Sequence, residues 1–492
     1  MESRYLVRII KTELYNFKNV KHGQIRYMNY SSVENHAQID TNDIVGIYGQ
    51  NGSGKTAMVE ALDILRGILA GESIPYEPYE GLLSKNQDTK LDATFYMEYL
   101  GEKYKVKYEA VLVANTEEKK INLSFEKIMY WRRGKTWKAE RDICFENPYY
   151  NQNSILDNAV AELQSEHKKE IEKVKVVKGI QSLAVYCAQK GVSIFFNDLM
   201  LNKIVETASD DIEEKTFHTI TRGMTSFGRM FFQVVKVNQL AEINRNMILP
   251  VNIHSESKYA VLQGCLPLVM KGQGKVPEQV YKQLKEVIDA INIALKAIIP
   301  NLMIELKPVD EELDKDGNNN VLVEVYSVRN DKRFLTRYES EGIKRIISLL
   351  SYLISLYNYP EICLVVDELD SGVFEYLLGE ILGVLNEEAK GQLIFTSHNL
   401  RAFEKLNIKN IVCTTINPQN RYIRLTGKEA NHNPRDFYIR TITVGGQKEE
   451  MYDEADLQSM GYAFRMACKP EDSIKIHFSE QFRKKLEGNT KE

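Results

Sequence analysis

The feature that most constrains this chain is the octapeptide Gly49-Gln-Asn-Gly-Ser-Gly-Lys-Thr56, which matches the phosphate-binding pattern G-x-x-x-x-G-K-[ST]. An apolar strand-like run, Ile44 to Tyr48, precedes it, and helix-forming residues follow from Ala57 to about Leu69. Glycines let consecutive backbone N–H groups surround a phosphate, and the start of the helix adds positive charge. A glycine-rich turn could match by chance, but the flanking strand and helix argue against that.

The pattern therefore predicts a nucleoside triphosphate site, with ATP and Mg²⁺ as the expected ligands. Lys55 is expected to reach the β- and γ-phosphates, and the Thr56 hydroxyl to ligate Mg²⁺. The residues expected to bind the nucleotide are Gly49, Gln50, Asn51, Gly52, Ser53, Gly54, Lys55 and Thr56.

Composition narrows the class of protein. A chain of 492 residues exceeds one ordinary domain, and 43% hydrophobic with 27% charged residues is typical of a soluble globular protein. The net charge of −4 gives no whole-chain argument for nucleic acid. The six cysteines stand singly, so we expect neither a zinc hook nor a redox pair, but reduced thiols in a cytoplasmic protein. No signal peptide and no membrane-spanning run is expected.

The expected elements alternate between sheet-rich and helical parts. Strands are expected at 4–17, 24–27, 91–99, 104–112 and 120–125, the last three as an antiparallel meander. Helical patterns cover 153–206, 225–246 and 278–297, which favours a compact helical lid or arm without a coiled-coil rod. Strands at 302–307 and 321–326, an apolar helix at 343–357, and buried strands at 361–366 and 391–396 follow.

A second part of the site follows the strand Leu364-Val-Val. Asp367 and Glu368 end this strand, where α/β folds place their ligands. Asp367 suits Mg²⁺ held through its water shell, and Glu368 suits a general base that polarises the attacking water. The alternative is a strand that simply ends at a solvated acidic turn. The phosphate loop in the same chain argues against this alternative.

Two further positions depend on their place relative to this strand. His398 ends the strand Ile394-Phe-Thr-Ser, where an imidazole can contact the γ-phosphate and sense its loss. A lone histidine is more often structural, so His398 matters only through this position. Ser340 is a good helix N-cap with Gly342 close behind, which makes an anion-friendly helix start. Taken alone, it is only a capped helix.

Together these elements resemble the ATP-binding-cassette (ABC) ATPases. They look most like the branch of chromosome-maintenance, recombination-repair and overcoming-lysogenisation-defect proteins. Tyr15-Asn16-Phe17-Lys18-Asn19 also resembles the strand that opens such heads. The resemblance implies an α/β fold, a P-loop NTPase head of ABC type with a mixed sheet, an antiparallel β-subdomain and an inserted helical lid or arm. The implied boundaries are 1–145 and 301–430 for the halves of the head, 146–300 for the insert and 431–492 for a C-terminal extension.

The resemblance also implies roles. Two heads of this family sandwich nucleotide between the phosphate loop of one and the signature helix of the other. Carried over, Ser340 and Gly342 stand for the signature, Asp367 with Glu368 for the acidic pair, and His398 for the switch. Asp370 and Ser371 fall in the dimer-contact loop, where Asp370 is counted among the nucleotide-binding residues. Glu341 departs from the transporter signature by placing an acid where a γ-phosphate docks, which predicts slow or gated hydrolysis. The glutamine loop is not located.

The tail from Pro434 to Tyr452 resembles stand-alone ATPases (AAA family) of bacterial abortive-infection and phage-defence systems. The resemblance implies a self-associating sensor or scaffold that controls a separately encoded effector, often a topoisomerase-primase-type nuclease. The 94 residues after His398 carry no acidic pair that ends an apolar strand, so no nuclease is predicted in this chain.

Two other functions stay open. A repair ATPase that clamps DNA could use the basic runs Lys168 to Lys178 and Arg132-Arg133-Gly-Lys135, although such runs are usually solvated faces. The second open function is a structural assembly that is locked by bound nucleotide and hydrolyses little of it.

Overall fold

A computed structural model describes most of the chain, and its contacts divide the chain into two units, Met1–Met451 and Tyr452–Glu492. The boundaries expected at 145, 300 and 430 stay predictions. The described residues are 5–28, 43–83, 88–133, 137–146, 180–206, 212–237, 248–256, 261–269, 273–313, 317, 319–330, 332–426, 434–453 and 456–467. The basic run 168–178 and the helical pattern over 153–179 lie outside the described residues.

The first unit is organised on a six-stranded sheet in the order β18-β17-β3-β16-β15-β8. Its strands are β18 (Tyr422–Ile423), β17 (Ile411–Thr414), β3 (Asp43–Tyr48), β16 (Gln392–Thr396), β15 (Cys363–Val366) and β8 (Phe232–Val235). All pairs are parallel except β17 with β18. The short strands of the parallel part are almost entirely buried, as expected where layers cover both faces. The expected α/β class is confirmed.

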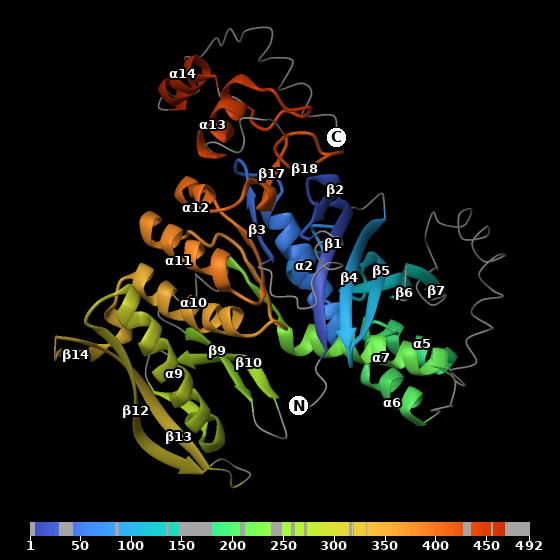
Figure 1. The fold of residues 1–492 in the computed structure, drawn as a ribbon, viewed down its shortest axis with the longest axis horizontal. Coiled ribbons are helices and arrows are strands. Elements are labelled where there is room, and N and C mark those ends of the chain that lie inside the picture. The colour runs from blue at the N-terminus through green and yellow to red at the C-terminus, as the bar shows by residue number, and fades with distance from the viewer. Residues whose placement is uncertain are drawn as a thin grey trace. The chain divides into compact units, whose positions relative to one another are not determined.

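Helices cover this sheet on both sides. Figure 1 shows α2 (Lys55–Ala70) on the side of the second, antiparallel sheet, with α11 (Glu375–Glu388) and α12 (Leu400–Glu404) on the other side. Near them runs α10 (Glu341–Asn358), and α13 (Pro434–Val444) packs on α12. Short turns of helix are α3 (Tyr76–Tyr79) and η4 (Ile408–Asn410). The carboxyl ends of β3, β15 and β16 therefore lie along one edge, where the sequence placed the site.

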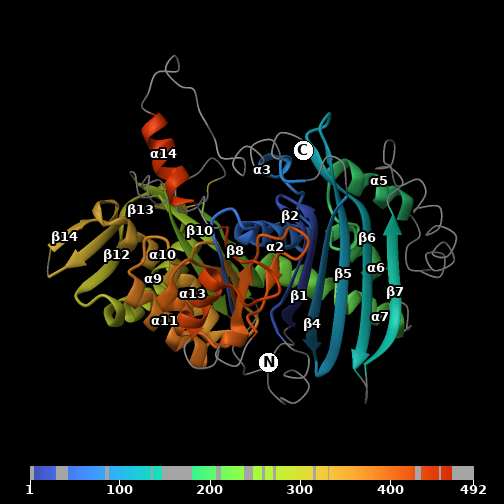
Figure 2. The ribbon, with the colours of Figure 1, turned by 90° about the horizontal axis from the view of Figure 1, so that it is seen from above.

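The antiparallel sheet has the order β2-β1-β4-β5-β6-β7, which confirms the predicted meander. Its strands are β1 (Leu6–Phe17), β2 (Val20–Arg26), β4 (Thr89–Tyr99), β5 (Glu102–Asn115), β6 (Lys120–Arg133) and β7 (Trp137–Glu146). Side chains of β5 alternate strictly, with Tyr104, Val106 and Tyr108 inward. Helices α5 (Ile180–Lys190), α6 (Asp198–Glu206) and α7 (Ile212–Ser226) lie beside this sheet in Figure 2.

The helix expected at 225–246 is wrong. Helix α7 ends at Ser226, a π-turn η2 (Phe227–Phe231) follows, and the chain becomes β8, which pairs with β15. The aromatic and β-branched residues Phe232-Gln-Val-Val235 complete the open edge of a buried sheet, and this pairing overrides the helical periodicity. Gly228 permits the turn because a Cβ there would lie 2.6 Å from the Ala70 nitrogen of α2.

The region 146–300, expected to be a helical lid or arm, is therefore not only helical. It also contains the hairpin β9 (Ile248–Glu256) with β10 (Val261–Val269), and β11 (Gly274–Pro277). Strand β11 joins a small sheet with β13 (Asn319–Arg329), β12 (Leu302–Leu313) and β14 (Lys332–Leu335), against which α9 (Glu278–Ile298) packs to form a second core. The strands expected at 302–307 and 321–326 are confirmed, and both extend further. A 3₁₀ turn, η3 (Thr336–Tyr338), leads into α10.

In the second unit, α14 (Leu457–Ala467) is the described helix.

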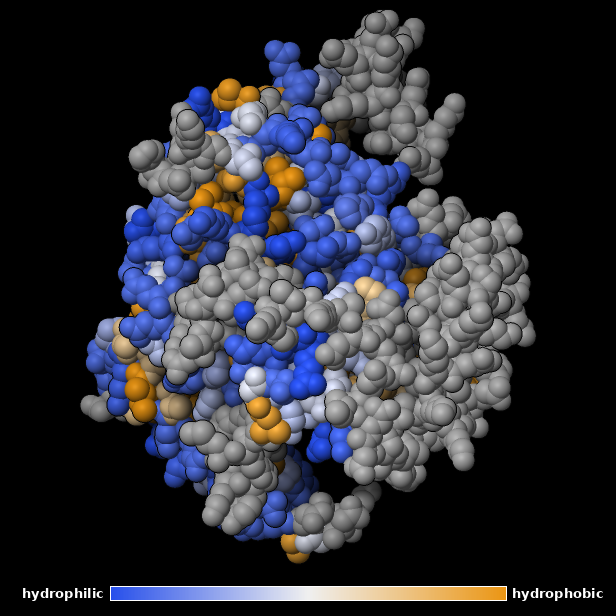
Figure 3. All heavy atoms as spheres, turned by 45° about the vertical axis from the view of Figure 1, so that its right-hand side comes forward, coloured by the Kyte–Doolittle hydropathy of each residue, from blue (hydrophilic) through white to orange (hydrophobic). Residues whose placement is uncertain are grey.

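On the face shown in Figure 3 the described residues are mostly hydrophilic, with hydrophobic side chains in small separate areas. No helix in the described parts of the chain is long and apolar enough to cross a membrane.

Candidate nucleotide-binding site

The phosphate loop needs glycine at two positions where other segments approach it. Gly49 has φ +153°, and a Cβ there would lie only 1.7 Å from the Thr414 hydroxyl of β17. Gly54 has φ +96°, and a Cβ there would lie 3.2 Å from the Arg421 side chain. The loop is therefore shaped both by left-handed backbone angles and by close packing from β17 and β18.

Lys55 begins α2 and points back over the loop. Its ammonium donates to the carbonyls of Gly49, at 2.8 Å, and Gln50, at 2.9 Å, and the side chain is buried. Burial lowers the pKa of Lys55, while the nearby Asp367, Glu368 and Asp370 act in the opposite direction. The cation thus lies between the loop and the acidic strand end.

The acidic pair is held by the neighbouring strands. The Asp367 N–H donates to the carbonyl of Val235 in β8, at 2.9 Å, and its carboxylate accepts from the Thr396 hydroxyl, at 2.6 Å. The same hydroxyl accepts from the Glu368 N–H, at 2.8 Å. Glu368 has φ +47°, a left-handed conformation that is uncommon for a residue other than glycine and often marks functional sites.

The strand ends and the loop enclose one cleft of about 380 Å³. It is lined by Lys18, Asn19, Asn51, Gly52, Gly54, Lys55, Thr56, Ala57, Glu368 and His398. The phosphate loop lies more than 300 positions before Glu368 and His398 in the chain, yet both groups line the same cleft. Asp367 is buried beside it. The size suits a small-molecule ligand.

His398 is connected to the loop that follows the acidic pair. Its backbone N–H donates to the Asp370 carboxylate at 3.0 Å. Partial burial and then the positive charge of Lys55 lower the pKa of the His398 imidazole, whereas Asp370 acts in the opposite direction. The side chain is therefore biased toward its neutral form near neutral pH.

Ser340 and Gly342 do not line the cleft around Lys55. The Ser340 hydroxyl caps α10 by accepting from the Ile343 N–H, at 3.4 Å. A Cβ on Gly342 would lie 2.3 Å from the Gly372 carbonyl oxygen, so the start of α10 touches the loop that follows the acidic pair. Ser340 and Gly342 therefore lie beside the loop that carries Asp370 and Ser371, and Asp370 connects this loop to His398 of the cleft.

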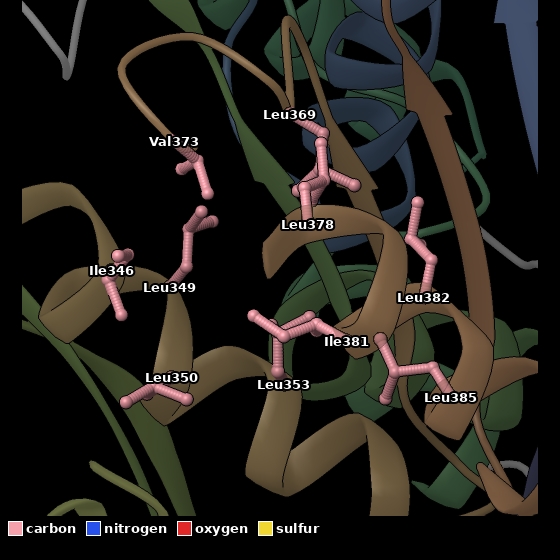
Figure 4. A pocket seen from close by; sticks show the side chains of 10 residues that line it. All are labelled: Ile346, Leu349, Leu350, Leu353, Leu369, Val373, Leu378, Ile381, Leu382 and Leu385. Carbon is pink, nitrogen blue, oxygen red and sulfur yellow. The ribbon is translucent and has the colours of Figure 1, made fainter. Parts of the chain in front are cut away.

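An aliphatic contact joins α10 to the same loop. Figure 4 shows leucine and isoleucine side chains of α10 and α11 facing one another, with Leu369 and Val373 from the connecting loop beside them. The lining residues are all aliphatic, so this contact packs α10 and α11 together and offers no polar side chain to a nucleotide.

Several residues around the phosphate loop were not identified from the sequence as part of the site. Lys18 and Asn19, in the turn between β1 and β2, line the cleft, and the sequence offered only the resemblance of the segment Tyr15–Asn19. The Thr414 hydroxyl donates to Ser53 Oγ at 2.5 Å, and the Tyr422 hydroxyl donates to the Gly54 carbonyl at 2.7 Å. No local motif marks Thr414, Arg421 or Tyr422.

The oxygen donors present fit a magnesium ion. The Thr56 hydroxyl and the Asp367 carboxylate are hard ligands of the kind that Mg²⁺ takes together with phosphate oxygens and waters. Among the described residues there is no cluster of three or more His, Cys, Asp or Glu that could hold a metal alone. Thr56 and Asp367 would therefore hold the ion jointly with the nucleotide.

The basic run around Arg132 is in part neutralised. Arg132 Nε lies 2.9 Å from the Glu102 carboxylate across the β5–β6 pair. This contact weakens the case for Arg132 as a phosphate-binding residue.

Comparisons with known proteins add limited information. No protein-family model matches the sequence, and no curated protein matches it. Among solved structures, the chain is similar to the Smc head domain of Pyrococcus furiosus bound to the C-terminal domain of ScpA. That match has 13% identity and a TM-score of 0.36, over 86% of this chain and 98% of that one.

Two further structures show the same level of similarity. The Smc head domain of Thermotoga maritima has 12% identity and a TM-score of 0.35, over 85% of this chain and 100% of that one. The recombination mediator protein RecF with ATPrS has 13% identity and a TM-score of 0.37, over 87% of this chain and 100% of that one. Because these TM-scores lie below 0.5, the function has to be argued from the residues of the site.

Proposed function

We propose that this chain is an ATP-binding and ATP-hydrolysing ATPase of the ABC type that works as a dimer of its heads. The observation that carries the proposal is the single cleft shared by Lys55 and Thr56 of the phosphate loop with Glu368 and His398 of two other strands. A phosphate grip and a strand-end carboxylate in one cleft are what transfer of a phosphoryl group to water requires.

Each residue has a distinct task in this proposal. Backbone N–H groups of the loop and the Lys55 ammonium bind the phosphates, and Mg²⁺ bound at Thr56 and Asp367 would neutralise charge on their oxygens. Glu368 accepts a proton from the attacking water, and its left-handed backbone directs the carboxylate into the cleft. His398, biased toward its neutral form, contacts the γ-phosphate and registers its loss.

A second copy completes the site in this proposal. Ser340 and Gly342 lie outside the cleft of their own chain, so their helix start can bind the phosphate held by a partner head. Large exposed side chains lie near them: Tyr338 is 68%, Phe374 69% and Tyr376 59% exposed. Exposed aromatic residues beside a polar group are typical of a contact surface.

The test is Glu368→Gln, compared with Glu387→Gln on the exposed face of α11. Glu368→Gln is expected to lower ATP turnover by roughly 100-fold or more, because the general base is lost, while ATP binding persists. With ATP bound and not hydrolysed, the variant is expected to sediment as a dimer, and Glu387→Gln to behave as the unmodified chain. Unchanged turnover in Glu368→Gln would remove Glu368 from its proposed role.

At the finer level we propose a cytoplasmic sensor or scaffold subunit of a bacterial anti-phage, abortive-infection system that controls a separate toxic effector. The support is the resemblance of the tail around Pro434–Tyr452. Co-purification with the product of a neighbouring gene, with and without ATP, tests this role. If DNA instead binds with steep salt dependence and stimulates turnover, the repair function is favoured. A stable ATP-bound dimer with negligible turnover favours the structural assembly.

A further inference from the structure

The last residues of the first unit are bonded to the turn between β17 and β18. The Glu449 carboxylate accepts from the side-chain amides of Asn417, at 2.8 Å, and Asn420, at 3.0 Å. The backbone carbonyl of Glu450 accepts from the Ile416 N–H at 2.9 Å. Both asparagine amides lower the pKa of Glu449, so the carboxylate is charged at neutral pH. The segment therefore binds both ends of the turn.

The same turn contacts the phosphate loop. Arg421, which ends the turn, is buried and donates to the Thr415 carbonyl and to the Asn19 carbonyl, each at 2.6 Å. The Asn19 side-chain amide donates in turn to the Gly52 carbonyl of the loop. The next residue, Tyr422, donates to the Gly54 carbonyl at 2.7 Å.

The turn is also hydrogen-bonded to β2. The Lys21 and His22 N–H groups of β2 both donate to the Pro418 carbonyl at 2.9 Å, and the Arg421 N–H donates to the His22 carbonyl at 3.1 Å. The turn is thus held between the N-terminal hairpin, the phosphate loop and the Glu449 segment. A displacement of the turn would move the carbonyls that Asn19 and Tyr422 hold.

The Glu449 segment is also where the chain leaves the first unit. Met451 is buried in the main core, and the second unit begins at the next residue, Tyr452. A partner that binds residues after Met451 therefore acts on the chain only a few residues from Glu449. Coupling between two binding sites is reciprocal. If the Glu449 segment changes the affinity for nucleotide, bound nucleotide therefore also changes how firmly this segment is held.

We propose that Glu449 is a positioning residue that, through the 415–421 turn, sets the geometry of the phosphate loop and thereby couples the C-terminal unit to nucleotide affinity. The inference rests on the proposed ATP binding and adds a control element to it. A partner or second copy that engages residues beyond Met451 and loosens Glu449 weakens ATP binding, and ATP tightens the Glu449 contacts.

The experiment compares Glu449→Ala with Glu450→Ala in the full-length chain. Glu450 is the matched control because its side chain makes no hydrogen bond among the described residues, and its backbone contact survives the substitution. We expect Glu449→Ala to raise the dissociation constant of a fluorescent ATP analogue by about threefold to tenfold, as loss of two hydrogen bonds to a charged group, one partly buried and one exposed, implies. Turnover at saturating ATP is expected to change little, since the acidic strand is untouched.

Asn420→Ala supplies an independent break of the same link from the other side. Because the Asn420 side-chain amide acts through its hydrogen bond to Glu449, the double variant is expected to bind ATP about as weakly as Glu449→Ala alone. If the effects of Glu449→Ala and Asn420→Ala on ATP affinity add in the double variant, the proposed link is overturned. It is also overturned if Glu449→Ala and Glu450→Ala have equal dissociation constants for the ATP analogue.

Amide hydrogen exchange without nucleotide separates this inference from the proposed function. Glu449→Ala is expected to speed exchange in residues 49–54 and 415–422, and Glu450→Ala is not. If the unmodified chain binds no ATP, the proposed function fails, while exchange still decides whether Glu449 positions the phosphate loop. Unchanged exchange in both segments would overturn the inference alone.

Discussion

At the scale of single residues, backbone conformation and charge both bear on the site. Glu368 keeps a left-handed φ of +47° immediately after a buried strand. This conformation costs roughly 1–2 kcal/mol for a residue with a Cβ. The Glu368 N–H donates to the Thr396 hydroxyl and the Glu368 carbonyl accepts from the Ser371 N–H, and these hydrogen bonds hold it in place.

This strain gives a stability prediction. Glu368→Gly relieves the left-handed backbone, although its more flexible unfolded chain offsets part of the gain. We expect Glu368→Gly to be more stable than Glu368→Ala by about 0.5–1 kcal/mol, with turnover equally reduced in both. Urea denaturation measures the difference. A less stable Glu368→Gly would show that the position carries no strain.

A second residue-scale prediction concerns the buried pair of Arg8 and Asp43, whose Nε and Oδ2 atoms are 3.6 Å apart. Burial raises the pKa of Asp43 from 3.8 to about 6, although Arg8 acts in the opposite direction. Between these values the folded chain keeps a proton that the unfolded chain releases. The contribution to stability is therefore complete below the ordinary pKa and is lost as pH rises through the raised one.

We expect the free energy of unfolding to fall between about pH 4 and pH 7 more in the unmodified chain than in Asp43→Asn, by up to about 3 kcal/mol. Asp43→Asn is expected to be less stable overall, because Arg8 loses its partner. Denaturant titrations across this pH range provide the measurement. Parallel pH curves for the two proteins would contradict the raised pKa.

At the scale of elements, the site depends on how strand ends and helix starts meet. Strand β8 closes the edge of β15, and Lys236, just after β8, donates to the Asp63 carboxylate of α2 at 2.6 Å. Tyr79 donates to the same carboxylate, also at 2.6 Å. The end of β8 is thereby fastened to the helix that begins with Lys55.

The start of α10 permits an element-scale test. Gly342→Ala would place a Cβ 2.3 Å from the Gly372 carbonyl, which forces the start of α10 away from the loop after the acidic pair. We expect ATP binding by the phosphate loop to persist, while ATP-dependent dimerisation and turnover fall at least about tenfold. The control is Gly383→Ala in α11, where the nearest atom, Lys405 Cδ, lies 3.9 Å away. Equal turnover in the two variants would contradict the role of this contact.

At the scale of the whole molecule, the proposed catalytic unit is larger than one chain. The cleft holds the phosphate loop, Glu368 and His398, whereas Ser340 and Gly342 lie elsewhere in the same chain. Completion by a second copy therefore predicts that nucleotide controls the assembly state.

We expect a nonhydrolysable ATP analogue to double the mass measured by light scattering. Phe374→Ser is expected to weaken this dimer by at least about tenfold, because an exposed aromatic near the contact loop can carry much of the binding energy. Val384→Ser on α11, whose original side chain is 57% exposed, is the control for lost surface hydrophobicity. If both variants dimerise equally well, Phe374 lies outside the interface.

The outline of the fold followed from local patterns. Extended runs separated by short turns predicted the meander, and short apolar runs predicted β3, β15 and β16. The helical periodicity at 225–246 was misleading, because β8 exists through its pairing with β15, more than 120 residues later. Such pairing depends on which sheet edge is open, which no local window of sequence contains.

The sequence by itself determined the phosphate loop, with the acidic pair and His398 at strand ends, because these chemistries need residues that are adjacent in the chain. Only the tertiary structure decided which distant groups shape that loop. Thr414 reaches Ser53 across 361 positions, and Arg421 reaches Asn19 across 402. Hydrogen bonds of this kind depend on how strands are ordered in the sheet and not on spacing along the chain. The phosphate loop is therefore recognisable as a motif, whereas its support by β17, β18 and Glu449 became visible only in the folded chain.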